Sequence, residues 1–196
     1  MSGAYTGQMR RIDSIYLAGP DIWFPEPHDH VSRKRELCEE AGFVGVTALD
    51  VDLVETEPSE AMARERYADA VARVRRCDAL IANLTPWRGP NCDPGTAFEA
   101  GFASALGKPV FAYLNVASEE EADHRERIEM LVGARMEEDG RVIDENGCLV
   151  EDFGLPETLM LWAEARRFFV VVTPDPLGDL TGLELSLEAL RVYADA

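Results

Sequence analysis

The chain has 196 residues, of which 46% are hydrophobic, 29% charged and 8% aromatic. This composition excludes intrinsic disorder, a collagen-like repeat and a membrane-embedded protein. The 19 Lys and Arg residues are outnumbered by 37 Asp and Glu residues, which leaves a formal net charge of −18. Because tight binding to phosphate backbones needs clustered Lys and Arg, we expect no nucleic-acid partner and no membrane partner. A small uncharged ligand is compatible with this charge.

The cysteines and the N-terminal segment indicate the cellular compartment of the protein. Its 4 cysteines contain no CxxC pair and its 3 histidines lack zinc-ligand spacing, so we expect neither a disulfide framework nor a structural metal. The segment 1–11 lacks the apolar core of a secretory signal. No apolar run approaches the ~20 residues of a membrane span. We therefore predict a cytoplasmic protein that forms a single domain over residues 1–196.

The first two thirds of the chain alternate short apolar runs with longer amphipathic stretches, which is typical of βαβ units around a parallel sheet. The run 79–84 is nearly all apolar, as in a central strand that is covered on both faces. The expected elements are a strand at 14–18, a helix at 31–41, a strand at 43–47, a helix at 59–76, a strand at 79–84, a helix at 94–106 and a strand at 110–113.

The last third of the pattern is less regular. Two turn signals, Asp139-Gly140 and Asn146-Gly147, lie between short apolar segments and predict a β-hairpin insertion. The expected elements are a helix at 119–132, the hairpin at 135–150, a helix at 156–167, a strand at 168–172 and a helix at 183–193. Together these patterns predict an α/β fold with flanking helices.

Ligands of open parallel sheets bind beyond the carboxyl ends of the strands, so we expect a site in the loops after Ala18, after Leu84 and after Tyr113. The first of these loops, 19–25, has no GxGxxG pattern and carries Asp21. It is therefore a poor cradle for a phosphate group.

The second loop leads into a helix of small and apolar residues that contains Glu99. A helical side chain leans toward positions three and four residues earlier, here Thr96 and Gly95, so we expect the Glu99 carboxylate to face open space near the start of the helix. A structural role, in which Glu99 bonds to a neighbouring loop or subunit, fits the pattern equally well. Asp93 before Pro94 is a typical N-cap, a role that is compatible with ligand contact.

Four ordered blocks resemble the nucleoside 2-deoxyribosyltransferase family. They are IYLAGP at 15–20, CDALIANLTPWRGP at 77–90, DPGTAFEAGFA at 93–103 and GKPV at 107–110, with a weaker match, GLPETLM, at 154–160. The resemblance implies a flavodoxin-like, doubly wound parallel sheet of about five strands. It also implies a homo-oligomer in which a neighbouring subunit completes each site.

The resemblance also implies roles for individual residues. Glu99 matches the family's nucleophile, Tyr16 the tyrosine that orients it, and Asp93 the aspartate that contacts the substrate. Met160 matches a segment that the adjacent subunit contributes. One departure is Thr158, which stands where the family has Asn and which shortens the polar reach toward the sugar.

A second departure concerns the acid that protonates the leaving base. A register anchored on Val74 and Asp78 places Ala70 at the position of the family's base-protonating Asp, with Asp69 one residue away. One residue turns a helical side chain by ~100°. Asp93 and Asp69 therefore both remain candidates for the general acid.

The resemblance predicts transfer of 2-deoxyribose from a 2'-deoxynucleoside to a free nucleobase, as in nucleotide salvage, without a metal or organic cofactor. Glu99 would trap the sugar covalently, as the carboxylate does in retaining glycosidases. In the loop beyond the first strand we expect Gly19 and Pro20 to contact the substrate. The expected stacking surfaces for the base are Trp23, Phe24 and Trp87.

Two other functions compete with this prediction. One is hydrolysis of an unphosphorylated nucleoside by a related N-glycosidase, since the acidic first loop argues against a nucleotide substrate. The other is a nucleoside-binding module without catalysis. Full hydrogen bonding of a buried Glu99, with no cavity beside it, would favour the binding module.

Overall fold

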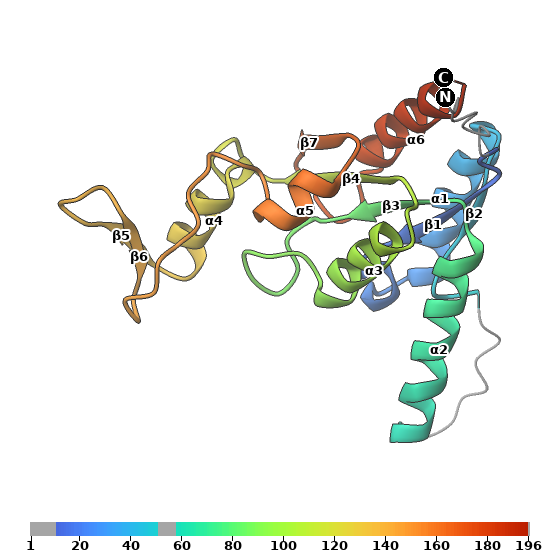
Figure 1. Ribbon diagram of the computed structural model, residues 1–196, viewed down its shortest axis with the longest axis horizontal. Helices are drawn as coiled ribbons and strands as arrows, with labels where there is room; N and C mark the ends of the chain where they lie inside the picture. Colours follow the sequence, from blue (N-terminus) through green and yellow to red (C-terminus); the bar gives the residue numbers. More distant parts are fainter. Residues whose placement is uncertain (1–10, 51–57, 196) are drawn as a thin grey trace, which may run out of the picture.

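The computed structural model describes residues 11–50 and 58–195, so the expectation about the N-terminal segment lies almost wholly outside the described residues. Five parallel strands form the sheet, in the order β2-β1-β3-β4-β7, which is the flavodoxin-like order (Figure 1). The strands are β1 (Ser14–Ala18), β2 (Val44–Val46), β3 (Ala79–Asn83), β4 (Val110–Val116) and β7 (Phe168–Val172). The predicted doubly wound α/β fold is confirmed.

Helices cover both faces of the sheet, and alternate residues of each strand enter one of two cores. Ile15 and Leu17 pack in one core and Tyr16 in the other. The first core is closed by α1 (Pro27–Glu40) and α6 (Thr181–Ala194), the second by α2 (Glu60–Arg76), α3 (Pro94–Ala105) and α5 (Leu159–Glu164). None of the helices in the described ranges has the length and apolar character needed to cross a bilayer.

Several boundaries differ from the prediction for local reasons. Helix α1 begins at Pro27 rather than at residue 31, because Pro is well suited to the first helical position. The predicted helix 119–132 is divided into a short 3-10 turn (Glu120–Ala122) and α4 (His124–Leu131). Asp123 is extended there, and its side chain caps α4 by accepting a hydrogen bond from the amide of Glu126.

The predicted helix 156–167 is also shorter, because its two ends are held elsewhere. The carbonyl of Pro156 accepts a hydrogen bond from Arg127, and the amide of Arg166 donates to the carbonyl of Val110 at the sheet. Strand β4 continues three residues beyond Tyr113 to Val116, and this extension is buried.

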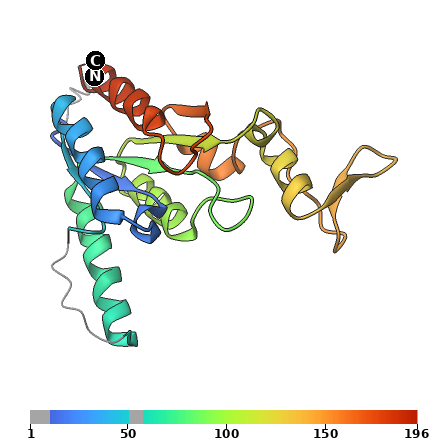
Figure 2. The same ribbon diagram turned by 180° about the vertical axis from the view of Figure 1, so that it is seen from behind.

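Residues 117–157 form an arm that extends away from the sheet (Figures 1 and 2). The arm contains α4 and the antiparallel hairpin of β5 (Ala134–Met136) and β6 (Val142–Asp144), so the predicted hairpin insertion is confirmed. Arg127 fixes the base of the arm and is only 1% exposed. Its guanidinium donates to the carbonyls of Pro90, Glu121 and Pro156 at 3.0, 2.6 and 2.7 Å. The arm is thereby joined to the loop that precedes α3.

Candidate functional site

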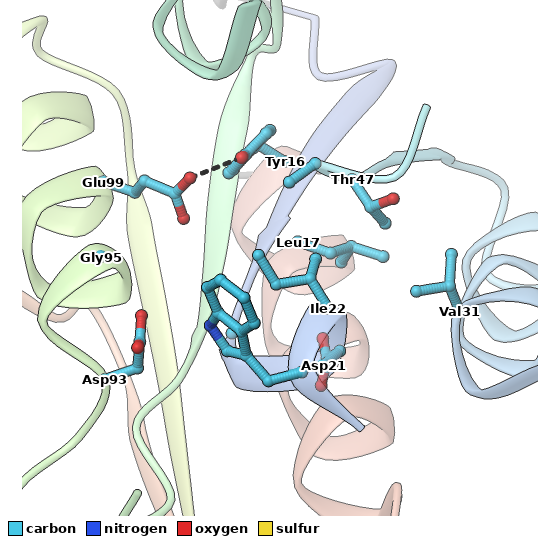
Figure 3. A pocket seen from close by; sticks show the side chains of 12 residues that line it. Tyr16, Leu17, Asp21, Ile22, Val31, Thr47, Asp93, Gly95 and Glu99 are labelled. Carbon is cyan, nitrogen blue, oxygen red and sulfur yellow. Dashed lines mark hydrogen bonds between the residues drawn. The ribbon is translucent and has the colours of Figure 1, made fainter. Parts of the chain in front are cut away.

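A cavity of about 200 Å³ lies beyond the carboxyl ends of β1 and β2, beside the start of α3 (Figure 3). This is the edge of the sheet at which parallel strands are expected to bind ligands. Five of the predicted site residues line it, namely Tyr16, Gly19, Trp23, Asp93 and Glu99; the other lining residues are Leu17, Asp21, Ile22, Val31, Thr47, Ala48 and Gly95.

Glu99 and Tyr16 meet in the wall of this cavity. The Tyr16 hydroxyl donates a hydrogen bond to Glu99 Oε1 at 2.6 Å (Figure 3). Tyr16 stands on β1 with its ring buried to 1% exposure, so its hydroxyl is held in place by the core. Within the described part of the chain, Glu99 Oε2 has no hydrogen-bond partner. Glu99 is thus half-buried beside a cavity, with one oxygen available to a ligand.

The surroundings of Glu99 change its acidity. Burial raises the pKa of Glu99 from 4.5 to about 7, the Tyr16 hydrogen bond opposes this rise, and the nearby Asp93 charge adds to it. Both protonation states are therefore populated near neutral pH. Burial and the Glu99 charge raise the pKa of Tyr16 well above its ordinary value of 10. Tyr16 thus remains a phenol that donates its hydrogen to the carboxylate.

Asp93 is both the N-cap of α3 and a residue that lines the cavity. Its side chain accepts hydrogen bonds from the Thr96 amide at 3.0 Å and from the Thr96 hydroxyl at 3.3 Å, as expected of an N-cap. It also lines the cavity on the same helix as Glu99 (Figure 3). A Cβ on Gly95 would lie 2.8 Å from Asp93 Oδ2. The absence of a side chain at Gly95 therefore leaves space for the aspartate and for the cavity.

A buried cluster of charges lies on the α1 side of the cavity. The Lys34 ammonium is paired with Asp21 Oδ2, and His30 Nε2 lies 3.3 Å from Asp21 Oδ1. Burial alone would raise the pKa of Asp21, but the Lys34 charge and the nearby His30 ring outweigh it and lower the pKa to about 2. Asp21 therefore carries a negative charge inside the cavity wall. Over residues 11–50 and 58–195, no three His, Cys, Asp or Glu side chains are grouped to hold a metal ion.

Three predicted contact residues of the loops do not line the cavity. Pro20 is buried in the first loop. The rings of Phe24 and Trp87 lie 5.8 Å apart beside the cavity, and the Arg88 guanidinium is 5.8 Å from the Trp23 ring and 5.1 Å from the Trp87 ring. Phe24 and Trp87 thus form a rim with the cavity residue Trp23.

Two further predicted residues lie outside the cavity of their own chain. Asp69 is exposed on α2, and Met160 on α5 is 79% exposed; neither is a lining residue. The strand β4 and its following loop also contribute no lining residue, although we expected one of the site loops there.

Sequence reasoning missed three features of the cavity and its surroundings. Thr47 and Ala48 follow β2, and the shared edge of parallel strands was a signal that could have identified them. Val31 comes from the buried face of α1. The pairing of Lys34 with Asp21 had no signal in the pattern, because a lysine on an amphipathic helix is ordinarily solvated.

Comparisons with known proteins identify the family and the fold. The family model described as nucleoside 2-deoxyribosyltransferase matches residues 15–160, which include every residue that lines the cavity. The structure is similar to a 2-desoxiribosyltransferase from Leishmania mexicana, with 29% sequence identity and a TM-score of 0.59 over 80% of this chain and 89% of that one.

Two other relatives extend the comparison. An uncharacterized protein of Schizosaccharomyces pombe is 33% identical over 109 residues, or 54% of this chain, and the chain spans about half (52%) of its length. A conserved protein from Enterococcus faecalis, with 17% identity and a TM-score of 0.51 over 91% of this chain and 99% of that one, shares the fold. With the family model matching most of the chain, we conclude that this protein belongs to the nucleoside 2-deoxyribosyltransferase family.

Proposed function

We propose that this protein transfers 2-deoxyribose from a 2'-deoxynucleoside to a free nucleobase, through a covalent bond between the sugar and Glu99. Members of the family are enzymes that act on nucleosides. The observation that carries the proposal is the state of Glu99, which is half-buried beside a cavity, held by Tyr16 through one oxygen and without a partner on the other among the described residues. A binding module would not need such a carboxylate.

The reaction balances with side chains alone. The ionised Glu99 oxygen attacks C1' of the sugar, the C1'–N bond breaks, and its electron pair leaves with the nucleobase, which takes a proton. A second nucleobase then attacks C1' on the face that the first base left and returns the proton of its attacking nitrogen to the acid that protonated the first base. The bond between C1' and Glu99 breaks, its electron pair returns to the carboxylate, and the original anomer is restored. No step requires a cofactor.

Asp93 is the candidate acid that the geometry supports. It shares the cavity and the helix with Glu99, whereas Asp69 is exposed on α2 and lines no part of the cavity. Proton transfer requires hydrogen-bond reach to the leaving base. We therefore assign substrate contact and base protonation to Asp93, and we assign no step to Asp69.

We also infer that a neighbouring subunit completes the cavity. Trp23 is 53% exposed and offers a surface on which a base can stack, with Phe24, Trp87 and Arg88 beside it. Met160 is 79% exposed on α5. We propose that residues 1–196 form one domain of a homo-oligomer, in which Met160 of a neighbour covers this cavity.

Incubation of the purified protein with 2'-deoxyinosine and cytosine, followed by chromatography, tests the proposal. We expect 2'-deoxycytidine to form, and we expect Glu99→Ala to reduce its rate by at least about 1000-fold because the covalent route is lost. Glu36→Ala is the control, since Glu36 is an exposed carboxylate on α1 and its loss should leave the rate unchanged.

Other outcomes would contradict parts of the proposal. Release of hypoxanthine without 2'-deoxycytidine would identify an N-glycosidase, in which water is the acceptor. No turnover of any of a panel of 2'-deoxynucleosides would identify a binding module. Full turnover in Glu99→Ala would exclude Glu99 as the nucleophile.

A further inference from the structure

The side chains that line the cavity include carboxylates but no cationic group. Asp21, Asp93 and Glu99 line it, and none of its lining residues is Lys, Arg or His. A phosphate group that entered this space would therefore meet carboxylates that repel it.

A cation nevertheless lies directly behind the wall. Lys34 is 1% exposed and does not line the cavity, because its ammonium is bound to Asp21 Oδ2. Both charges are close enough to Glu99 to affect its pKa. The charge of Lys34 lowers the pKa of Glu99, and the charge of Asp21 raises it. Asp21 thus separates Lys34 from the cavity and neutralises it.

The residues around Asp21 hold it between Lys34 and the cavity. It is 3% exposed and follows Gly19 closely enough that a Cβ on Gly19 would lie 2.9 Å from Asp21 Oδ2. Its second oxygen, Oδ1, faces His30 Nε2 at 3.3 Å and has no hydrogen-bond partner of good geometry among the described residues. Asp21 is thus held between Lys34 and His30 in the wall of the cavity.

We propose that Asp21 is a specificity-determining residue that makes the site accept unphosphorylated nucleosides and reject nucleoside 5'-phosphates, because it covers and neutralises Lys34. This inference rests on the proposed function. The selection has two parts: the pairing with Asp21 leaves Lys34 unable to bind a phosphate, and the carboxylates of Asp93 and Glu99 repel one.

The test is the preference of the enzyme between two substrates that differ only in a phosphate. We would measure kcat/KM for 2'-deoxyinosine and for 2'-deoxyinosine 5'-monophosphate, with cytosine as the acceptor, in the wild type and in Asp21→Asn. The amide keeps the size of Asp21 and an oxygen for Lys34, but it removes the charge. We expect the ratio of kcat/KM, nucleoside over monophosphate, to fall by at least about 10-fold.

Two further variants separate the charge of Lys34 from other effects. Asp29→Asn makes the same change in net charge at an exposed position on α1 and should leave the ratio unchanged. Asp21→Asn/Lys34→Met removes the uncovered cation as well, and we expect the ratio to return toward that of the wild type. An unchanged ratio in Asp21→Asn would overturn the proposal. A double variant that kept the ratio of Asp21→Asn would overturn the part assigned to Lys34.

The proposal can fail independently of the proposed function. If the wild type turned over no nucleoside, the proposed function would be wrong, and calorimetric titration of the same two ligands into the wild type and Asp21→Asn would supply the ratio of Kd values instead. If Asp21→Asn did not fold, Asp21→Ser would replace it. A ratio of Kd values that did not differ between wild type and variant would again overturn the role of Asp21.

Discussion

Glu99 and Tyr16 meet through a 2.6 Å hydrogen bond although they stand 83 positions apart in the chain. Burial raises the pKa of Glu99 to about 7, whereas the bond from Tyr16 lowers it. A folded-state pKa above the ordinary 4.5 means that the folded protein holds this proton more tightly than the unfolded chain. The contribution of Glu99 to the free energy of unfolding is therefore full below about pH 4.5 and is lost as the pH rises toward 7. An ionised nucleophile at neutral pH thus costs the fold some stability.

Removal of the Tyr16 hydroxyl should change the pH dependence of the reaction. In Tyr16→Phe the ionised Glu99 loses its donor, so we expect its pKa to rise and the acid limb of kcat/KM to move to higher pH. Hydrogen bonds to charged groups contribute about 1.5 to 3 kcal/mol, which corresponds to a loss of about 10- to 100-fold at pH 6. Initial rates with 2'-deoxyinosine and cytosine between pH 5 and 9 would measure it.

A second tyrosine provides the control for this variant. Tyr67 is 60% exposed on α2, and Tyr67→Phe removes a hydroxyl that does not contact Glu99. The acid limb of kcat/KM against pH in Tyr67→Phe should coincide with that of the wild type. If the limb of Tyr16→Phe also coincided with it, Tyr16 would not control the ionisation of Glu99.

At the scale of elements, α3 and its N-cap carry two of the three carboxylates that line the cavity, Asp93 and Glu99, on a helix of small residues. Asp93 begins the helix, and Glu99 lies less than two turns further along. Glycine costs a helix about 1 kcal/mol relative to alanine, so the glycines of α3 need a reason in packing or function. At Gly95 the reason is the space that Asp93 and the cavity occupy.

Two glycine-to-alanine substitutions in this helix should differ in their effect: one should lower the activity, and the other should raise the stability without changing the activity. In Gly95→Ala the new Cβ would meet Asp93 Oδ2 at 2.8 Å, so the carboxylate must move and we expect kcat/KM to fall by at least about 10-fold. In Gly101→Ala the new Cβ meets no atom within 4 Å. We expect Gly101→Ala to stabilise the protein by up to about 1 kcal/mol with unchanged kcat/KM.

Urea unfolding and initial rates with 2'-deoxyinosine would measure both effects. The comparison separates helix propensity from cavity shape, because the two variants add the same methyl group to the same helix. Wild-type activity in Gly95→Ala would show that the position of Asp93 does not matter for the reaction.

At the scale of the whole molecule, the arm and α5 expose many large apolar side chains. Exposed apolar groups that occur together mark interaction surfaces in soluble proteins. The exposed apolar side chains of the arm and α5 are Met130, Leu131, Val132, Met136, Leu149, Phe153, Leu159, Met160 and Trp162, each at least 40% exposed. These exposed side chains support the proposed homo-oligomer, because a chain with a net charge of −18 associates with a copy of itself only where apolar contact outweighs repulsion.

A mixed oligomer would test whether sites are shared. If each site needs Glu99 of one subunit and Met160 of another, then Glu99→Ala and Met160→Ala chains that are co-expressed with different tags should form some intact sites. For dimers that assemble at random, about a quarter of the sites would be intact. We expect the mixed oligomers to transfer 2-deoxyribose faster than either variant alone.

The control is a mixture of the two separately purified variants, assayed before subunits exchange. Its rate should equal the average of the two variants. The same average in the co-expressed oligomers would show that each subunit completes its own site, and a monomeric wild type in sedimentation would contradict the assembly itself.

Local patterns predicted most of the elements because strands and helices follow from apolar periodicity and from capping residues. The strand 168–172 was predicted with its observed bounds, and Ser59 and Asp93 were recognised at the starts of α2 and α3. The predictions failed where a long-range contact decides the end of an element. Arg127 and the sheet edge shorten α5, and continued burial lengthens β4.

For the site, the sequence by itself determined the parallel sheet, the edge at which ligands bind, and the carboxylates of α3 as residues that helix stability does not require. The family resemblance already implied the contact of Tyr16 with Glu99 and placed Met160 in the site of a neighbouring subunit. Only the tertiary structure decided that Asp21 covers Lys34 and that Asp69 lies outside the cavity of its own chain. The physical reason is that periodicity reports which face of an element is buried. The partner of a buried charge, and with it the pKa of a reactive group, depends on side chains that meet only after the chain has folded.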